Sequence, residues 1–262
     1  MTDDTSSPPP PTRDPFAFFA SGHGGALAVA MSVVALGLAA APYATGGSFG
    51  DKVRAYLIAN PEVLDEAVQA RQQGEEAKRV ETINAAVAAN AALLAPDPRD
   101  PAIGPADAKV TVIEFFDYRC PGCKAVSEDY LALIRAHPDV RFVFKEWPIL
   151  DRGDDTTSNY AARAALAAHA QGRYLPVHQA LMAEPALDPE TVDRILTENG
   201  VDLARAREVI ASPETDDLIG DINTAGQTLG LVGTPTFLIN GRTTSTINPV
   251  EVSAAIEAAK RS

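Results

Sequence analysis

The stretch "KVTVIEFFDYRCPGCKAVSEDYLALIRAH", residues 109–137, decides the fold of this chain. Its first eight residues are mostly β-branched or aromatic and almost continuously apolar, which is typical of a strand buried on both faces of a sheet. From Cys123 onward, apolar side chains recur at helical spacing. Cys120 and Cys123, the two cysteines of the chain, therefore lie at a predicted strand-to-helix junction.

A cysteine pair with this spacing has three readings. Half of a zinc site needs further ligands. The chain has no other cysteine, and its histidines show no ligand spacing: His23, His137, His169 and His178. A passive disulfide across two residues constrains almost no chain. A helix N-terminus, in contrast, stabilises a thiolate through its free N–H groups and dipole, which favours a redox pair. Cys120 is then the exposed attacking thiol and Cys123 the resolving thiol.

Composition excludes some classes of function. The chain has 262 residues, enough for one large or two small domains, and 46% of them are hydrophobic. Its net charge is −13, and no basic cluster is present. Because a nucleic-acid binder usually presents a basic face, we expect no nucleic-acid partner.

The N-terminal region predicts targeting. Residues 1–24 are polar and proline-rich, so we expect a disordered tail. Residues 25–44 carry no charge and are long enough to span a bilayer, which predicts a signal peptide or a membrane anchor. A cut after the small-residue pattern Ala39 to Ala41 would leave Pro42 first, so the prediction leans toward an uncleaved anchor. The remainder is expected to be exported, where disulfides persist.

The chain after this segment divides into two predicted parts. Residues 45–96 read as a helical extension with a thin, alanine-rich apolar stripe. This extension either packs on its own domain or forms a homo-oligomer through residues 51–95. Residues 97–262 form the second part.

Further signals complete the second part. Residues 140–150 read as another strand. Asn240-Gly241, flanked by residues 236–239 and 242–245, is a strong hairpin signal, and a last helix follows Asn248. Repeated helix caps fill about residues 152–230. This order predicts an α/β thioredoxin-like fold with an inserted all-helical domain.

At this point a family resemblance is clear. The segments "IEFFDYRCPGC" (113–123) and "VGTPTFLINGR" (232–242) resemble the DsbA-type thiol–disulfide oxidoreductases of bacterial envelopes, and the pattern covers roughly residues 96–262. The segment "VRAYLIANPEVLDEAVQA" (53–70) resembles the N-terminal extension of ScsC-like and Com1-like members.

The resemblance implies roles for residues outside the cysteine motif. Thr234-Pro235 is implied to be a cis pair facing the cysteines, with the Gly233 and Thr234 backbone free to bind an extended substrate. Glu114 takes the place of a buried acid six positions before the first cysteine, and Lys145 takes that of its usual lysine partner.

Physical reasoning supports part of this picture. By alternation, Glu114 points to the same side as the apolar residues Val112 and Phe116. Burial would raise its pKa and could let it accept a proton from Cys123. A purely structural ion pair is the alternative role for Glu114.

The resemblance implies a periplasmic enzyme that exchanges disulfides with unfolded or cysteine-containing envelope proteins. A DsbB-like or DsbD-like membrane partner is expected, and no cofactor besides the redox-active disulfide. Pro121 and Gly122 would tune the potential. Glycine replaces the histidine of the best-known oxidases, and Thr234 is shared with isomerase-type relatives, so an oligomeric isomerase or reductase stays the alternative. A Cu(I)-binding envelope protein is a further alternative, since thiolates suit that ion.

Overall fold

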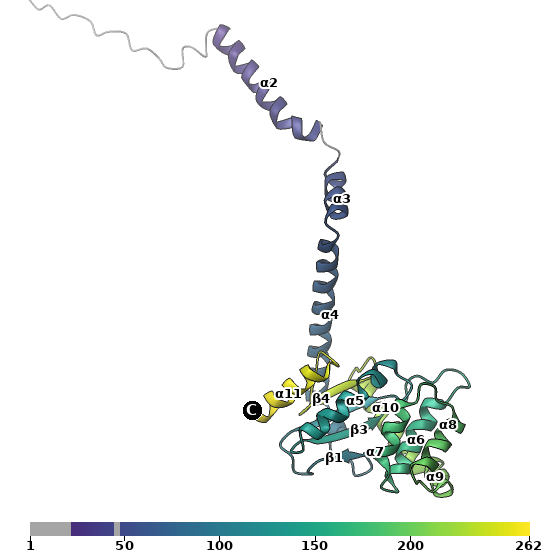
Figure 1. Cartoon of the computed structure of the whole chain (residues 1–262). Coiled ribbons are helices and arrows are strands. Elements are labelled where there is room, and N and C mark those ends of the chain that lie inside the picture. Colours follow the sequence, from purple (N-terminus) through teal and green to yellow (C-terminus); the bar gives the residue numbers. More distant parts are fainter. Residues whose placement is uncertain (1–21, 45–47) are drawn as a thin grey trace, which may run out of the picture. The chain divides into compact units, whose positions relative to one another are not determined.

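A computed structural model describes residues 22–44 and 48–262 (Figure 1). The chain separates into two compact units, Met1–Arg71 and Gln72–Ser262. The first unit holds α2 (Gly22–Ala44), α3 (Phe49–Ala59) and the beginning of α4 (Glu62–Ala89). The second holds the rest of α4 and every strand among the described residues.

The expected membrane segment, residues 25–44, lies within α2. No helix within residues 22–44 and 48–262 is long and apolar enough to cross a membrane. The segment contains eight alanines and two glycines, which carry little apolar surface. The expectation of a membrane-spanning anchor is therefore not supported, and the signal peptide stays a prediction. The tail predicted for residues 1–24 lies almost entirely outside the described residues.

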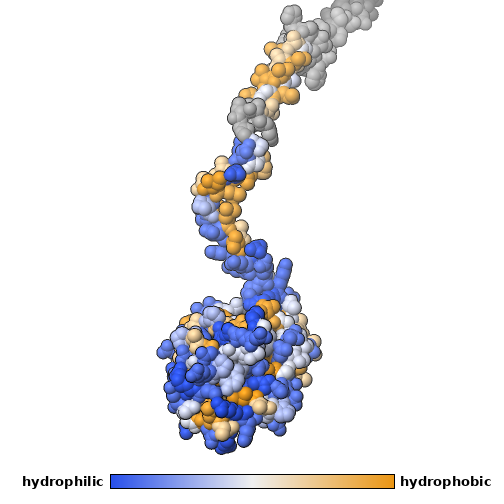
Figure 2. All heavy atoms as spheres, turned by 90° about the vertical axis from the view of Figure 1, so that its right-hand side faces the viewer, coloured by the Kyte–Doolittle hydropathy of each residue, from blue (hydrophilic) through white to orange (hydrophobic). Residues whose placement is uncertain are grey.

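Helix α3 begins at a capping box. The Ser48 hydroxyl accepts from the Asp51 N–H at 3.3 Å, and the Asp51 carboxylate accepts from the Ser48 N–H at 2.8 Å. Large apolar side chains stay exposed along α3 and the start of α4: Phe49, Val53, Tyr56, Ile58, Leu64 and Val68. These six residues are called the apolar face of the extension, and Figure 2 shows hydrophobic surface in this part of the chain.

The second unit is built on a mixed sheet. Its elements after α4 are η1 (Ala91–Leu94), β1 (Ala102–Ile103), β2 (Thr111–Phe116), α5 (Pro121–Ala136), β3 (Arg141–Glu146), α6 (Thr157–His169), α7 (Tyr174–Ala183), α8 (Pro189–Glu198), α9 (Leu203–Ile210), α10 (Pro213–Thr228), β4 (Thr236–Ile239), β5 (Arg242–Thr243) and α11 (Pro249–Arg261). The strand order is β1-β3-β2-β4-β5. Strands β2 and β3 are parallel, and the other pairs are antiparallel. Strand β2 is central and buried from its second residue onward, as its apolar sequence predicts.

The sheet separates two cores. Val112, Phe116 and Phe144 lie in the core that also contains apolar residues of α5, α7 and α11. Ile113 and Phe115 lie in the other core, with residues of α4 and α10. Neighbouring residues of one strand point to opposite faces, so the register decides which charged side chains share a core.

Five helices, α6 to α10, lie between β3 and β4, and we call them the helical insertion (Figure 1). The last helix of the insertion, α10, and Trp147, which precedes the insertion, pack in the same core as Ile113 and Phe115 of the sheet. Trp147 follows β3, and a Cβ added at Gly226 of α10 would lie 2.6 Å from its indole ring. A glycine is therefore required at this close helix-to-sheet contact.

The hairpin prediction is confirmed. Strands β4 and β5 pair on either side of Asn240-Gly241. Both turn residues have positive φ, 47° and 76°, as a two-residue type I′ turn requires. The Asn240 side chain also accepts from the Thr111 N–H at 2.8 Å, which ties the turn to the start of β2.

Candidate active site

The cysteine motif lies where the sequence predicts it, after β2 and at the start of α5. Cys120 is the N-cap of α5, and Pro121 occupies the first turn, where its missing N–H leaves no hydrogen bond unmade. Both cysteines are free thiols. Cys120 is only 8% exposed, so the prediction that this thiol is exposed is wrong. Cys120 is still the more accessible of the two cysteines, because Cys123 is 1% exposed.

The Cys120 sulfur has an environment that favours the thiolate. As a thiol it donates to the carbonyl oxygen of Thr234, with Sγ and O 3.1 Å apart. Hydrogen bonds from the Cys123 thiol, from the side chain of Thr234, and from the N–H groups of Cys123 and Gly122 outweigh burial and lower the pKa of Cys120 to about 5. At neutral pH this sulfur is a nucleophile and a good leaving group.

The Cys123 sulfur has the opposite environment. Burial raises its pKa far above the ordinary value, and its hydrogen bond to Cys120 and the nearby charge of Glu114 act in the same direction. Cys123 therefore stays protonated until a base removes its proton.

Glu114 is a buried carboxyl near this thiol. It is 3% exposed, and its Oε2 has no hydrogen-bond partner. Burial raises the pKa of Glu114 from 4.5 to about 8. The register places Glu114 opposite Phe144, so it points into the core beneath α5 as alternation predicts.

Lys145 does not pair with Glu114, and this expectation is wrong. Lys145 lies opposite Phe115, on the other face of the sheet. Its Nζ lies 2.5 Å from Oδ2 of the buried Asp100. The next residue, Glu146, shares the face of Glu114 instead, because β3 alternates by one residue.

The predicted substrate-side loop lies over the cysteine motif. The Thr234–Pro235 peptide bond is cis, as the resemblance implies. A Cβ added at Gly122 would lie 3.3 Å from Pro235 Cδ and 3.7 Å from Cys120 Sγ, so a larger residue would crowd the loop. The Gly233 carbonyl accepts from the Thr236 hydroxyl at 2.7 Å.

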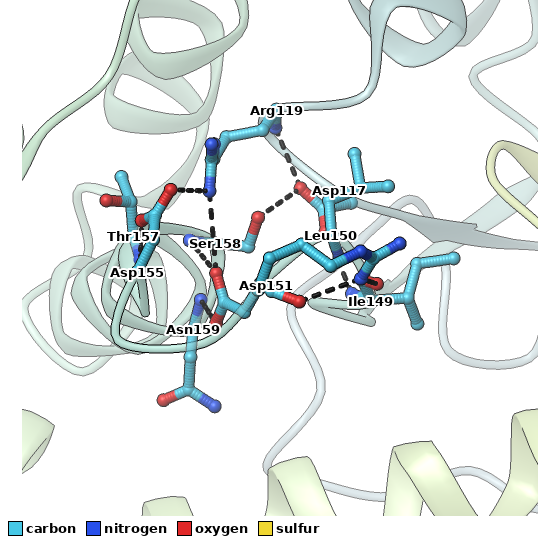
Figure 3. Close-up of polar contacts among 10 residues, drawn as sticks. Asp117, Arg119, Ile149, Leu150, Asp151, Asp155, Thr157, Ser158 and Asn159 are labelled. Carbon is cyan, nitrogen blue, oxygen red and sulfur yellow. Dashed lines mark hydrogen bonds and ion pairs between the residues drawn. The ribbon is translucent and has the colours of Figure 1, made fainter.

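Several residues at the site were missed by the sequence reasoning. Asp117, Tyr118 and Arg119 link β2 to Cys120, and each contacts a segment outside this loop. Figure 3 shows the contacts of Asp117 and Arg119. A run of polar residues directly after a buried strand was the available signal. Its partners could not be foreseen, because they lie 28 to 60 positions further along the chain.

No group of three or more histidine, cysteine, aspartate or glutamate side chains within the described ranges could hold a metal ion. The dithiol itself is the reactive group of this site.

Comparison with known proteins agrees with the fold. A family model described as "Thioredoxin" matches residues 97–258, and one described as "Copper resistance protein ScsC N-terminal domain" matches residues 48–78. A thioredoxin-like oxidoreductase from Silicibacter pomeroyi DSS-3 is 36% identical, with 63% of this chain and 95% of that one covered and a TM-score of 0.58. The catalytic domain of Proteus mirabilis ScsC is 21% identical, covering 68% and 99%, with a TM-score of 0.60, and shares the fold.

Curated relatives show the same domain in longer proteins. The Na(+)/H(+) antiporter NhaA 3 of Salinispora tropica is 34% identical over 145 residues, which is 55% of this chain and 22% of the relative. The chain thus spans about a fifth of the length of the first curated relatives it matches.

The family model over residues 97–258 and the ScsC N-terminal match over residues 48–78 confirm the resemblance to DsbA-type, ScsC-like proteins. The chain belongs to the thioredoxin family, and it carries an ScsC-type N-terminal segment.

Proposed function

We propose that this chain is an exported oxidoreductase that forms disulfides in protein substrates. The observation that carries the proposal is the contrast between its two thiols. Cys120 is held as a thiolate at the N-terminus of α5 with a pKa of about 5, and Cys123 is buried behind it with a raised pKa. Such a pair favours one sulfur as the point of exchange.

The reaction starts from the oxidised pair. A substrate thiolate attacks Cys120 Sγ, a new S–S bond forms, and the Cys120–Cys123 bond breaks. Cys123 leaves with the electron pair and takes up a proton. A second substrate thiol then attacks the mixed disulfide and releases Cys120 as a thiolate, so two electrons pass from the substrate to the pair.

Glu114 donates a proton to Cys123, or accepts one from it, in this scheme. With its pKa raised to about 8, it is mainly neutral at pH 7 and can donate to the leaving Cys123. In the reverse direction, the carboxylate accepts the Cys123 proton before Cys123 resolves the mixed disulfide. Lys145 has no place in this step, because it lies on the other face of the sheet.

The remaining parts have matching roles. The backbone of Gly233 and Thr234 would bind an extended substrate beside Cys120, and Pro121 and Gly122 would tune the potential. The substrates are unfolded or cysteine-containing envelope proteins in the periplasm. A DsbB-like membrane protein would reoxidise the pair, whereas a DsbD-like partner would keep it reduced in the isomerase or reductase alternative. The proposal needs no cofactor beyond the Cys120–Cys123 disulfide.

The test combines a measurement of the redox equilibrium with an assay of substrate refolding. The chain is equilibrated with glutathione buffers to obtain the potential of the pair, and it is mixed with reduced and with scrambled ribonuclease. An oxidising potential with recovery from the reduced substrate supports the proposal. The absence of exchange with either substrate overturns it.

An isomerase or reductase is the second candidate, and the apolar face of the extension favours it. Six large apolar side chains exposed on α3 and the start of α4 are suited to self-association through residues 51–95. An isomerase usually works as an oligomer whose sites face each other. Recovery of scrambled ribonuclease by an oligomer supports this candidate, and a monomer in sedimentation analysis counts against it. Retention of Cu(I) at one ion per chain without exchange would support the copper-binding alternative.

A further inference from the structure

Three consecutive residues connect β2 to Cys120, and the proposed function assigns none of them a role. All three of them, Asp117, Tyr118 and Arg119, contact the helical insertion or the segment that leads into it. Lys124, directly after Cys123, does the same. The cysteine motif is therefore flanked on both sides by contacts to the insertion.

Asp117 is the first anchor, and its carboxylate is buried. Its Oδ1 accepts from the Arg119 N–H at 2.8 Å and from the Ser158 hydroxyl of α6 at 2.9 Å (Figure 3). Its Oδ2 accepts from the N–H groups of Ile149 and Leu150 at 2.8 and 3.0 Å. One carboxylate thus holds the loop before Cys120 against both the segment after β3 and the start of α6.

Tyr118 is the second anchor, and it points inward. Its hydroxyl donates to Glu146 Oε1 at 3.1 Å and lies 3.0 Å from Nδ1 of His178 on α7. The Tyr174 hydroxyl of α7 donates to the same Glu146 oxygen at 2.9 Å. All four side chains are buried, so these bonds do not compete with water. The loop is therefore fastened to α7 as well as to α6.

Arg119 is the third anchor, and it points toward the surface. Its guanidinium forms ion pairs with Asp155 at 2.8 Å and with Asp151 at 3.7 Å, both between β3 and α6 (Figure 3). Asp151 in turn accepts from the N–H groups of Ser158 and Asn159 in the first turn of α6, at 2.7 and 3.0 Å. The residue next to Cys120 is thereby connected to the start of the insertion.

Lys124 is the anchor on the other side of the motif. Its ammonium donates to the carbonyl oxygens of Leu181, Met182 and Glu184 at 3.0, 3.3 and 2.7 Å. These carbonyls lie at the C-terminal end of α7, where a cation is favoured. All three of its N–H donors are used, so α5 is fastened to α7 one residue after Cys123.

We propose that the helical insertion and the segment that leads into it position Cys120 through Asp117, Tyr118 and Arg119, so that residues distant from the sulfur help to set the reactivity of the dithiol. The inference rests on the proposed function of the pair. Its physical basis is the dependence of the thiolate on the N–H groups of Gly122 and Cys123, which must point at Cys120 Sγ. A hydrogen bond to a charged group depends strongly on geometry, so greater mobility of the loop before Cys120 would weaken the hydrogen bonds to its thiolate.

Two variants of the full-length chain test this inference without touching the motif. Ser158→Ala removes the hydroxyl that binds Asp117, and Asp155→Asn weakens the exposed ion pair of Arg119. For each, the thiolate absorbance of Cys120 is titrated and the equilibrium with glutathione is measured. We expect the pKa of Cys120 to rise by up to about one and the equilibrium constant for oxidation of substrate to fall by up to about tenfold.

Glu198→Gln is the matched control. Glu198 forms an exposed ion pair with Arg194 within α8, in the same insertion but with no contact to the loop. Its replacement should leave both the Cys120 titration and the glutathione equilibrium unchanged.

The outcomes separate the inference from the proposed function. Folded variants with the Cys120 titration and potential of the unmodified chain overturn the inference and leave the proposed function intact. An unmodified chain that exchanges no disulfide overturns the proposed function. If the buried Ser158→Ala variant does not fold, Asp155→Asn decides the question, because its side chain is 44% exposed and its loss is tolerated by the core.

Discussion

The sharpest prediction concerns the buried acid beneath the dithiol. Burial raises the pKa of Glu114 from 4.5 to about 8, so the folded chain holds the proton of this carboxyl more tightly than the unfolded chain does. Below about pH 4.5 the carboxyl is protonated in both states, so it does not lower the free energy of unfolding. As the pH rises toward 8, this free energy falls, because the unfolded chain releases the proton that the folded chain still holds. Glu114→Gln removes this dependence.

The magnitude follows from the two pKa values. Each step of one in pKa corresponds to about 1.4 kcal/mol. At pH 7, which is 2.5 above the unfolded value, Glu114 costs about 3 kcal/mol of unfolding free energy, and above pH 8 the cost approaches about 5 kcal/mol. The reduced Glu114→Gln variant should therefore match the unmodified chain at pH 4 and exceed its stability by about 3 kcal/mol at pH 7.

Urea unfolding of the reduced proteins at pH 4, 7 and 9 measures this difference. Glu198→Gln, which changes an exposed carboxylate, should give no pH-dependent gain. If the difference in unfolding free energy between Glu114→Gln and the unmodified chain is the same at all three pH values, the reasoning is refuted. The same variant should also slow resolution of a mixed disulfide by Cys123 at pH 7, on the order of 100-fold, because the proton acceptor is lost.

Three further predictions test other parts of the account. Alkylation of Cys120 in the reduced chain should titrate with a midpoint near pH 5, and a midpoint above pH 8 would contradict the described environment. Lys145→Met should lower stability by about 3 kcal/mol, because it leaves Asp100 buried without its partner, while the Cys120 midpoint stays constant. Gly226→Ala should lower the melting temperature, since its Cβ would lie 2.6 Å from the Trp147 ring, and an unchanged value would contradict that contact.

Local sequence chemistry predicted the centre of this molecule well. The buried strand, the cysteine motif at the start of α5 and the Asn240-Gly241 hairpin each depend on neighbouring residues. The position of Glu114 on the face beneath the dithiol followed from simple alternation along one strand. Such features can be inferred from a single sequence because the pattern of neighbouring residues indicates them.

Contacts between distant segments could not be predicted in the same way. Lys145 was assigned to the wrong face, because only the register of β3 against β2 distinguishes it from Glu146. Its true partner, Asp100, precedes it by 45 positions. Tyr118 was not singled out, since its contact with His178 of α7 depends on how the insertion folds back onto the sheet.

The central claim is that Cys120 is the sulfur that exchanges with substrate and Cys123 the sulfur that resolves. The most direct measurement is to treat the Cys123→Ser variant with a peptide disulfide at pH 7 and to locate the adduct by mass spectrometry. The account predicts a stable mixed disulfide on Cys120, while the unmodified chain forms none that persists, and Cys120→Ser forms no adduct. Equal adduct formation at Cys123 in the Cys120→Ser variant would contradict it.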